Sequence, residues 1–158
     1  MFEGCRDEHE QTMEFYRNPA QIPLLSGSEA GDLNRVTERF AFKANSYYLG
    51  LIDWDDPDDP IRRLVVPHPD ELREWGSLDA SNEAANTVAR GLQHIYAVSA
   101  LYLAADTCAA YCRFCFRKRL FMRQNQEIDV DPGPALAYVR EHREIRDVLV
   151  TGGDPLVM

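Results

Sequence analysis

Three cysteines at short intervals are the residues of this sequence best suited to chemistry. Cys108, Cys112 and Cys115 have the spacing C-x3-C-x2-C, so one loop can bring three thiolates to a single metal centre. Structural zinc sites use four nitrogen or sulfur ligands, and common electron-transfer clusters use four cysteines. The nearest histidines, His94 and His142, stand 14 residues before Cys108 and 27 residues after Cys115. Three thiolates therefore predict an iron–sulfur cluster with one iron that the protein does not hold; zinc and inert thiols remain the alternatives.

Positive charge surrounds this triplet in a chain whose net charge is −9. Arg113 lies inside the triplet, and Arg117, Lys118 and Arg119 follow it. Nearby cations lower the pKa of a thiol and offset the negative charge of a cluster. We therefore expect these residues to place positive charge around the thiolates, and they can also pair with carboxylates of ligands; the alternative is the solvated start of a helix. The remaining cysteine, Cys5, stands far away in a polar stretch and is expected to be a free thiol.

The segments around the triplet predict one βαβ unit. The apolar runs 100–105 and 147–151 have the length and composition of buried strands. A helix opened by prolines is predicted between them, over 132–142. The cysteines follow the first strand, and Gly152-Gly153-Asp154 follows the second. Function in α/β folds gathers at the C-terminal ends of strands, so both motifs are candidate sites.

The first part of the chain is predicted to be mainly helical. Apolar periodicity favours helices over 8–17, 32–42 and 70–75. The acidic stretch Asp53–Pro60 lacks the central Gly and the final Glu of a calcium loop, and its prolines indicate a turn leading into a helix near Pro60. The predicted fold class is therefore α/β, with an N-terminal helical segment followed by the βαβ unit.

Bulk composition is that of an ordinary soluble protein. The 158 residues are 45% hydrophobic and 27% charged, with a mean hydropathy of −0.40. The pI near 4.9 argues against nucleic acid or an anionic membrane as a general partner. No apolar run approaches the roughly 20 residues that span a bilayer, and the N-terminus has no secretory signal. We expect a cytoplasmic location, where four cysteines favour metal ligation over disulfides.

Three stretches of the chain resemble the lysine 2,3-aminomutase family of the radical S-adenosylmethionine superfamily. The triplet with its aromatic, Cys-x3-Cys-x-Phe-Cys, is similar to the superfamily signature. The matching stretches are Tyr47–Arg62, Thr107–Arg119 and Asp147–Leu156.

The resemblance implies a role for each matched site residue. Cys108, Cys112 and Cys115 would ligate three irons of a [4Fe–4S] cluster, and S-adenosylmethionine would chelate the fourth iron and yield a 5′-deoxyadenosyl radical. Four residues would contact S-adenosylmethionine: Phe114, Gly152, Gly153 and Asp154. Phe114 would lie against the adenine. Arg117 would pair with the carboxylate of the substrate. For Phe114 the alternative is an aromatic residue of the core, and for the Gly-Gly-Asp string it is a plain turn. No residue is assigned as catalytic.

The resemblance also implies an architecture and partners. Residues 1–98 would form a mainly helical region, and 99–158 the start of a TIM-like radical S-adenosylmethionine barrel. The substrate would be an amino acid or an aminoacyl group on a protein, the electron donor would be of flavodoxin or ferredoxin type, and a homo-oligomer is possible in such a family. Pyridoxal 5′-phosphate follows from the resemblance alone, because 94–99 holds no Arg or Lys for its phosphate.

The number of barrel strands limits the expected activity. A full barrel has eight strands in about 200–250 residues, whereas two barrel strands are predicted here. We therefore expect a truncated product or fragment with little aminomutase activity of its own. The alternatives are a non-catalytic remnant that binds a cluster or metal, and a small zinc-binding interaction module.

Overall fold

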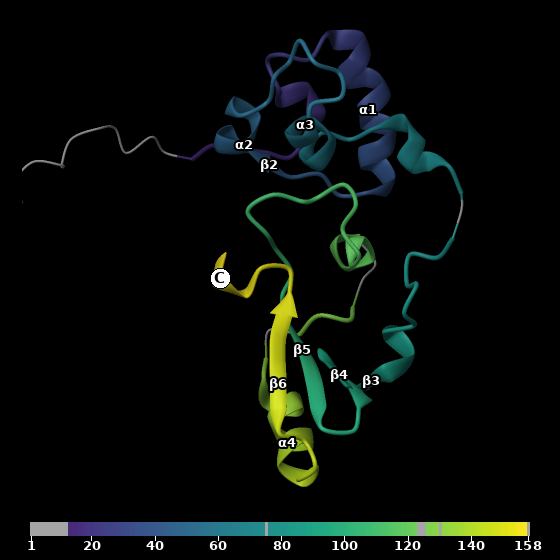
Figure 1. Cartoon of the computed structure of the whole chain (residues 1–158), viewed down its shortest axis with the longest axis vertical. Coiled ribbons are helices and arrows are strands. Elements are labelled where there is room, and N and C mark those ends of the chain that lie inside the picture. Colours follow the sequence, from purple (N-terminus) through teal and green to yellow (C-terminus); the bar gives the residue numbers. More distant parts are fainter. Residues whose placement is uncertain (1–12, 75, 123–125, 130, 158) are drawn as a thin grey trace, which may run out of the picture.

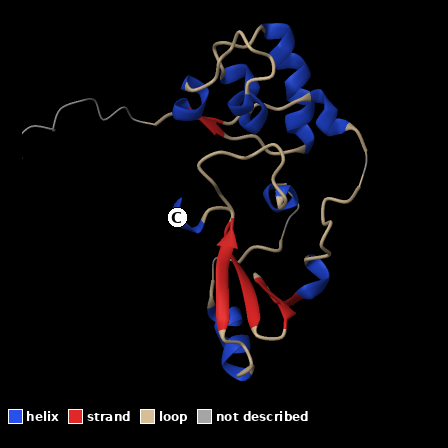
Figure 2. Cartoon of the chain, viewed as in Figure 1, coloured by secondary structure: helices blue, strands red, loops and turns tan. Residues whose placement is uncertain are grey.

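The computed structural model describes residues 13–74, 76–122, 126–129 and 131–157. A helical unit lies at one end of the molecule and a β-sheet at the other, and the cysteine-bearing segment runs between them (Figure 1). Most of the helices gather in the first unit, and the longer strands gather in the second (Figure 2). The site is thus built where two units meet.

The helical unit packs short elements around one apolar core. Its helices are α1 (Gly27–Arg39), α2 (Ser46–Gly50) and α3 (Pro60–Val65), with 3-10 turns η1 (Pro19–Gln21) and η2 (Pro69–Leu72). Strands β1 (Phe15–Tyr16) and β2 (Ala44–Asn45) pair antiparallel. The core contains Leu33 of α1, Phe42 and Val65 of α3, each almost fully buried. These helices therefore share one hydrophobic centre.

Two predicted helices differ from those of the structure. Helix α1 begins at Gly27, earlier than predicted, because the Ser26 side chain accepts a hydrogen bond from the Glu29 amide at 3.2 Å and caps the helix. The helix predicted over 8–17 is wrong for its described residues, since Phe15 and Tyr16 form strand β1; residues 8–12 lie outside the described part of the chain. A two-residue strand gives no readable alternation, which explains the error.

The acidic stretch before α3 is a capping turn, as predicted. The Asp59 carboxylate accepts a hydrogen bond from the Arg62 amide at 2.7 Å and caps the helix that starts at Pro60. This backbone hydrogen bond lowers the pKa of Asp59. The carboxylates of the turn thus serve the helix.

The second unit is a four-stranded sheet in the order β3 (Thr87–Ala89), β4 (Leu92–Tyr96), β5 (Ser99–Ala105) and β6 (Asp147–Gly152). Strands β5 and β6 are parallel and are connected through helix α4 (Gly133–Glu141). The predicted βαβ unit is therefore confirmed. The strands form no closed barrel in the described part of the chain.

Strand β4 pairs antiparallel with β3 on one side and with β5 on the other, and neither β3 nor β4 was predicted. Val88, Ile95 and Tyr96 are 40%, 54% and 68% exposed, so these strands lack the apolar alternation that marks a half-buried sheet. Gly91, with φ +75°, makes the tight turn between them. The remaining core lies between the sheet and α4, where Leu92, Tyr102 and Ala135 pack together.

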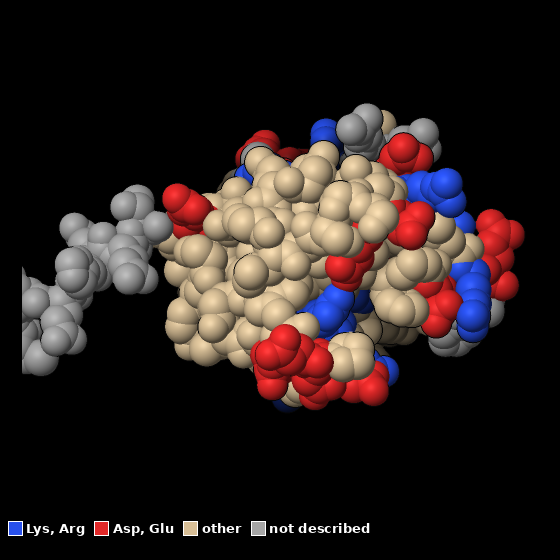
Figure 3. Space-filling model, turned by 90° about the horizontal axis from the view of Figure 1, so that it is seen from above, with Lys and Arg blue, Asp and Glu red and all other residues tan. Residues whose placement is uncertain are grey.

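Charged groups lie toward the margins of this end of the molecule. Figure 3 shows a broad central area without charged side chains, and lysine and arginine side chains that lie among acidic ones and gather into no basic patch on the visible face. Among the described residues, no helix has the length and apolar character needed to cross a bilayer.

Candidate cluster-binding loop

The cysteine triplet lies on the loop that leaves β5. Cys108 and Cys115 are half-buried, Cys112 is exposed, and all three are free thiols. Cys115 and Cys112 both lie near enough to Cys108 for their negative charges to help raise the pKa of its thiol. Within the described residues, no three His, Cys, Asp or Glu side chains converge on the position of a single metal ion.

Burial dominates the acidity of these thiols. Burial, followed by the charges of Cys115 and Asp154, raises the pKa of Cys108 to about 11. Burial also raises the pKa of Cys112. The expectation that nearby cations lower these pKa values is therefore wrong. Because metal ligands must be thiolates, loading of the loop has to displace the proton of Cys108.

A short extended segment of the helical unit supports the cysteine loop. The Tyr111 amide donates to the Lys43 carbonyl at 2.8 Å, and the Asn45 side chain donates to the Ala109 carbonyl at 3.2 Å. The Lys43 ammonium donates to the Thr107 hydroxyl at 3.0 Å and to the Cys108 carbonyl at 2.6 Å. Lys43 and Asn45 therefore hold the first part of the loop, residues 107–111.

One carboxylate, Glu71, whose side chain is 12% exposed, fastens the loop to the same unit. The guanidinium of Arg113 donates from Nε and Nη2 to the two Glu71 oxygens at 3.0 and 2.8 Å, and from Nη1 to the Ala41 carbonyl at 2.8 Å. The Lys118 ammonium binds the same carboxylate. Burial alone would raise the pKa of Glu71, but the hydrogen bonds and charge of Arg113, with the hydrogen bond of Lys118, hold it below its usual range.

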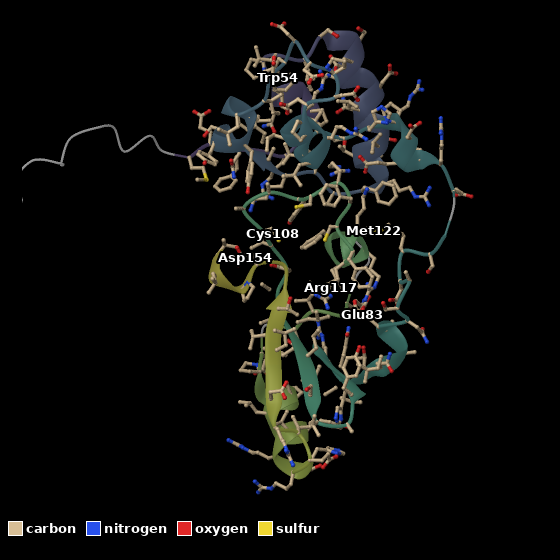
Figure 4. The ribbon with its side chains drawn as sticks, in the orientation of Figure 1. Trp54, Glu83, Cys108, Arg117, Met122 and Asp154 are labelled. Atoms are coloured by element: carbon tan, nitrogen blue, oxygen red, sulfur yellow. The ribbon has the colours of Figure 1, made fainter. Side chains whose placement is uncertain are left out.

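A second carboxylate, the buried Glu83, binds the next two cations. Arg117 donates from Nε and Nη2 to Glu83 at 3.1 and 2.8 Å, and Arg119 donates to it at 2.9 Å (Figure 4). Arg119 also pairs with Glu127 at 2.8 Å and with Asp79 at 3.6 Å. Burial raises and the two arginines lower the pKa of Glu83, and the arginines prevail.

The four loop cations thus pair with carboxylates of this chain, which the sequence did not lead us to expect. The alternative of a solvated helix start is wrong, because Arg113 and Arg119 are only 7% and 8% exposed. Sequence reasoning missed Glu71 and Glu83, which stand 42 and 34 positions before their arginines. No local pattern marks such distant partners.

The Gly152-Gly153-Asp154 string closes against the start of the cysteine loop. The Gly153 amide donates to the Ala105 carbonyl at 2.6 Å, and the Asp154 amide donates to the Thr107 carbonyl at 2.8 Å. A Cβ atom on Gly153 would lie 2.1 Å from the Thr107 oxygen, and one on Gly152, whose φ is +122°, would lie 2.4 Å from the Ala105 oxygen. The close backbone approach that the glycines permit is therefore to residues 105–107. Asp154 lies beside Cys108 (Figure 4), and its negative charge helps to raise the pKa of that thiol.

Phe114 and Arg117 occupy different surroundings. Phe114 is 75% exposed, so the alternative of a core aromatic is wrong. Arg117 lines a cavity of about 430 Å³ that runs along the sheet past Leu101 and Leu149. Its guanidinium, bound by Glu83, keeps Nη1 directed at the Thr151 hydroxyl at 3.4 Å.

The described residues do not fit pyridoxal 5′-phosphate. The sequence contains two lysines, Lys43 and Lys118. Lys43 is bound to the cysteine loop and Lys118 to Glu71, so neither is available for a Schiff base. The three cysteines, by contrast, are free and gathered on one loop, which fits an iron–sulfur cluster. Cys5 lies outside the described residues.

Comparisons with known proteins point to one group of enzymes. No protein-family model matches the chain. It is 55% identical over 137 residues to the Aquifex aeolicus protein named "Putative L-lysine 2,3-aminomutase", with 87% of this chain and 37% of the relative covered. It is 33% identical over 140 residues to the L-lysine 2,3-aminomutase of Clostridium subterminale, and 35% identical over 141 residues to the glutamate 2,3-aminomutase of Clostridioides difficile. These two matches cover 87% and 88% of this chain, and 33% of each relative.

The chain spans about a third of the length of these curated relatives. The matched region takes in most of the chain, as the stretches quoted from the sequence led us to expect. The chain is therefore homologous to about a third of the lysine 2,3-aminomutases, the family of the radical S-adenosylmethionine superfamily that its sequence resembles.

Proposed function

We propose that this chain is the cluster-binding part of a radical S-adenosylmethionine aminomutase. The observation that carries the proposal is the loop itself. It holds three free cysteines on one segment, and the carboxylates of Glu71 and Glu83 bind its cations. The close contact of Gly152 and Gly153 with the backbone of residues 105–107, which we call the glycine seam, closes it. Cys108, Cys112 and Cys115 would each ligate one iron of a [4Fe–4S] cluster. Such a cluster, when bound, supplies the electron that cleaves S-adenosylmethionine to methionine and a 5′-deoxyadenosyl radical.

The surrounding residues would bind and orient S-adenosylmethionine. The exposed ring of Phe114 offers an apolar face for the adenine. The Asp154 carboxylate, beside Cys108, suits the ammonium group of the methionine moiety. Gly152 and Gly153 would act through the seam, because they hold Asp154 next to the first cysteine.

The substrate class is an amino acid, free or attached to a protein as an aminoacyl group. Arg117 is the candidate receptor for its carboxylate, because a guanidinium pairs well with carboxylates and this one lines the cavity along the sheet. Glu83 already takes two of its donors, so a substrate carboxylate would share the arginine through the remaining ones. A flavodoxin or ferredoxin would serve as electron donor, and a cytoplasmic location would keep the cluster reduced.

Anaerobic reconstitution with iron and sulfide tests this proposal. We expect four irons and four labile sulfides per chain, and a reduced-cluster paramagnetic signal that changes when S-adenosylmethionine is added. Cys112→Ala should lose the cluster, and Met122→Leu, a substitution outside the triplet, should keep it. Uptake of one zinc ion without sulfide would contradict the proposal and support the zinc module.

An assay of S-adenosylmethionine cleavage distinguishes the proposed function from the alternative of a non-catalytic remnant. Dithionite reduction of the loaded chain should release methionine and 5′-deoxyadenosine if the loop positions the cosubstrate. A cluster that forms without this cleavage would support the alternative of a non-catalytic cluster-binding remnant.

A further inference from the structure

The cations of the cysteine loop are balanced by carboxylates. Arg113 and Lys118 share Glu71, while Arg117 and Arg119 share Glu83. Arg119 has two further acidic partners, Glu127 and Asp79. Four positive charges therefore meet four negative ones, and this network leaves little net charge to act on a cluster.

Lys43 is the exception among the buried cations of the site. Its side chain comes from the helical unit, is 7% exposed, and reaches the start of the cysteine loop. Its ammonium binds the Thr107 hydroxyl and the Cys108 carbonyl, both neutral acceptors, and lies 4.7 Å from the centre of the Phe15 ring. No carboxylate of the described residues forms an ion pair with it. An uncompensated positive charge therefore lies beside the first cysteine.

We propose that Lys43 is a positioning residue that raises the reduction potential of a cluster held by the three cysteines. The inference rests on the proposed function. One-electron reduction adds a negative charge to the cluster, so a fixed cation nearby stabilises the reduced form more than the oxidised form. Because Lys43 is buried, salt screens this interaction weakly.

A charge effect can be separated from a purely structural one by the choice of variants. Lys43→Gln keeps hydrogen-bond donors near Thr107 and Cys108 but removes the charge, whereas Lys43→Arg keeps the charge. Arg140→Gln removes the same charge from the exposed end of α4, at the far end of the molecule from the helical unit (Figure 1), and serves as the matched control.

The measurement is an anaerobic redox titration of the reconstituted full chain, with dithionite as electron source and visible absorption as readout. Iron and sulfide contents are measured alongside. For Lys43→Gln we expect the ratio of reduced to oxidised cluster at a fixed potential to fall about tenfold, which is about 59 mV for a one-electron couple. Lys43→Arg and Arg140→Gln should stay near the wild-type value.

The outcomes distinguish a failure of the proposed function from a failure of the inference about Lys43. A wild-type chain that forms no cluster contradicts the proposed function. If the fully loaded Lys43→Gln variant has the wild-type reduction potential, the inference about Lys43 is overturned and the proposed function is not. The same holds if Lys43→Arg shifts the reduction potential as much as Lys43→Gln does. If Lys43→Gln loses iron, Phe15→Glu decides, because it places a carboxylate beside the ammonium without removing it. An unchanged potential in that variant would also overturn the inference.

Discussion

At the scale of single residues, the two glycines of the glycine seam are the positions that tolerate a larger side chain least. Gly153 lies so close to the Thr107 backbone that a methyl group would need either β6 or the cysteine loop to move. Gly31, in the exposed part of α1, has open space around the position of a Cβ atom. The two glycines therefore form a matched pair with opposite expected effects.

Gly153→Ala should destabilise the chain by about 3 kcal/mol, the upper part of the usual range for overpacking, because the clash is with backbone. Gly31→Ala should stabilise it by about 0.5–1 kcal/mol, because alanine lowers the entropy cost of the helix. Urea unfolding followed by circular dichroism measures both. Equal stabilities of the two variants would mean that the seam is loose in solution.

Glu83 is the second residue whose removal should be costly. Glu83→Gln leaves Arg117 and part of Arg119 without a buried anionic partner. We expect a loss of about 3 kcal/mol, the lower end for a broken buried pair, because Arg119 keeps Glu127. Glu74→Gln removes an 84% exposed carboxylate and should change stability by less than about 0.5 kcal/mol. Urea unfolding of both variants gives the comparison, and a small effect at Glu83 would show that the pair is solvated.

At the scale of elements, Asn45 couples a helix to the cysteine loop. Its side-chain oxygen accepts from the Tyr48 amide at 2.9 Å and caps α2, while its nitrogen donates to the Ala109 carbonyl. A serine at this position can cap the helix but is too short to reach Ala109. Asn45→Ala loses both contacts.

We expect Asn45→Ala to be about 1 kcal/mol less stable than Asn45→Ser, which is the usual value of a helix cap. Both variants should make the loop thiols react faster with a disulfide reagent, measured in a Cys5→Ser background. Asn18→Ser, at the cap of the 3-10 turn η1, is the control and should leave thiol reactivity unchanged. Faster reaction in the control as well would assign the effect to general loosening of the unit.

The elements also show what the sequence could predict. Strands β5 and β6 were predictable because short apolar runs are local signals, and helix α4 because prolines mark its start. The antiparallel strands β3 and β4 were not, since residues such as Tyr96 face solvent. The cysteines were predicted from spacing alone, whereas Glu71 and Lys43 act through contacts 42 and 65 residues apart that exist only after folding. The division of the chain into a mainly helical region, 1–98, and the start of a barrel, 99–158, stays a prediction.

At the scale of the whole molecule, the ionic network joins three parts of the chain. Glu71 belongs to the helical unit, Glu83 to the segment before β3, and both bind the cysteine loop. The network therefore holds the two units against the loop. Its strength depends on the ionisation of these two carboxylates, so it should depend on pH.

The direction of this dependence follows from the pKa values. Those of Glu71 and Glu83 lie below their ordinary value of 4.5 in the folded chain. A carboxylate with a lowered folded pKa contributes stability at pH values above 4.5, and this contribution is lost as the pH falls through the folded pKa. We expect the urea midpoint of the wild-type chain to be steady from pH 7 to about 5 and to fall steeply below it. Glu83→Gln should start lower and fall less over the same range, because it has one titrating carboxylate fewer; an equal slope in the two proteins would show that the network does not control acid stability.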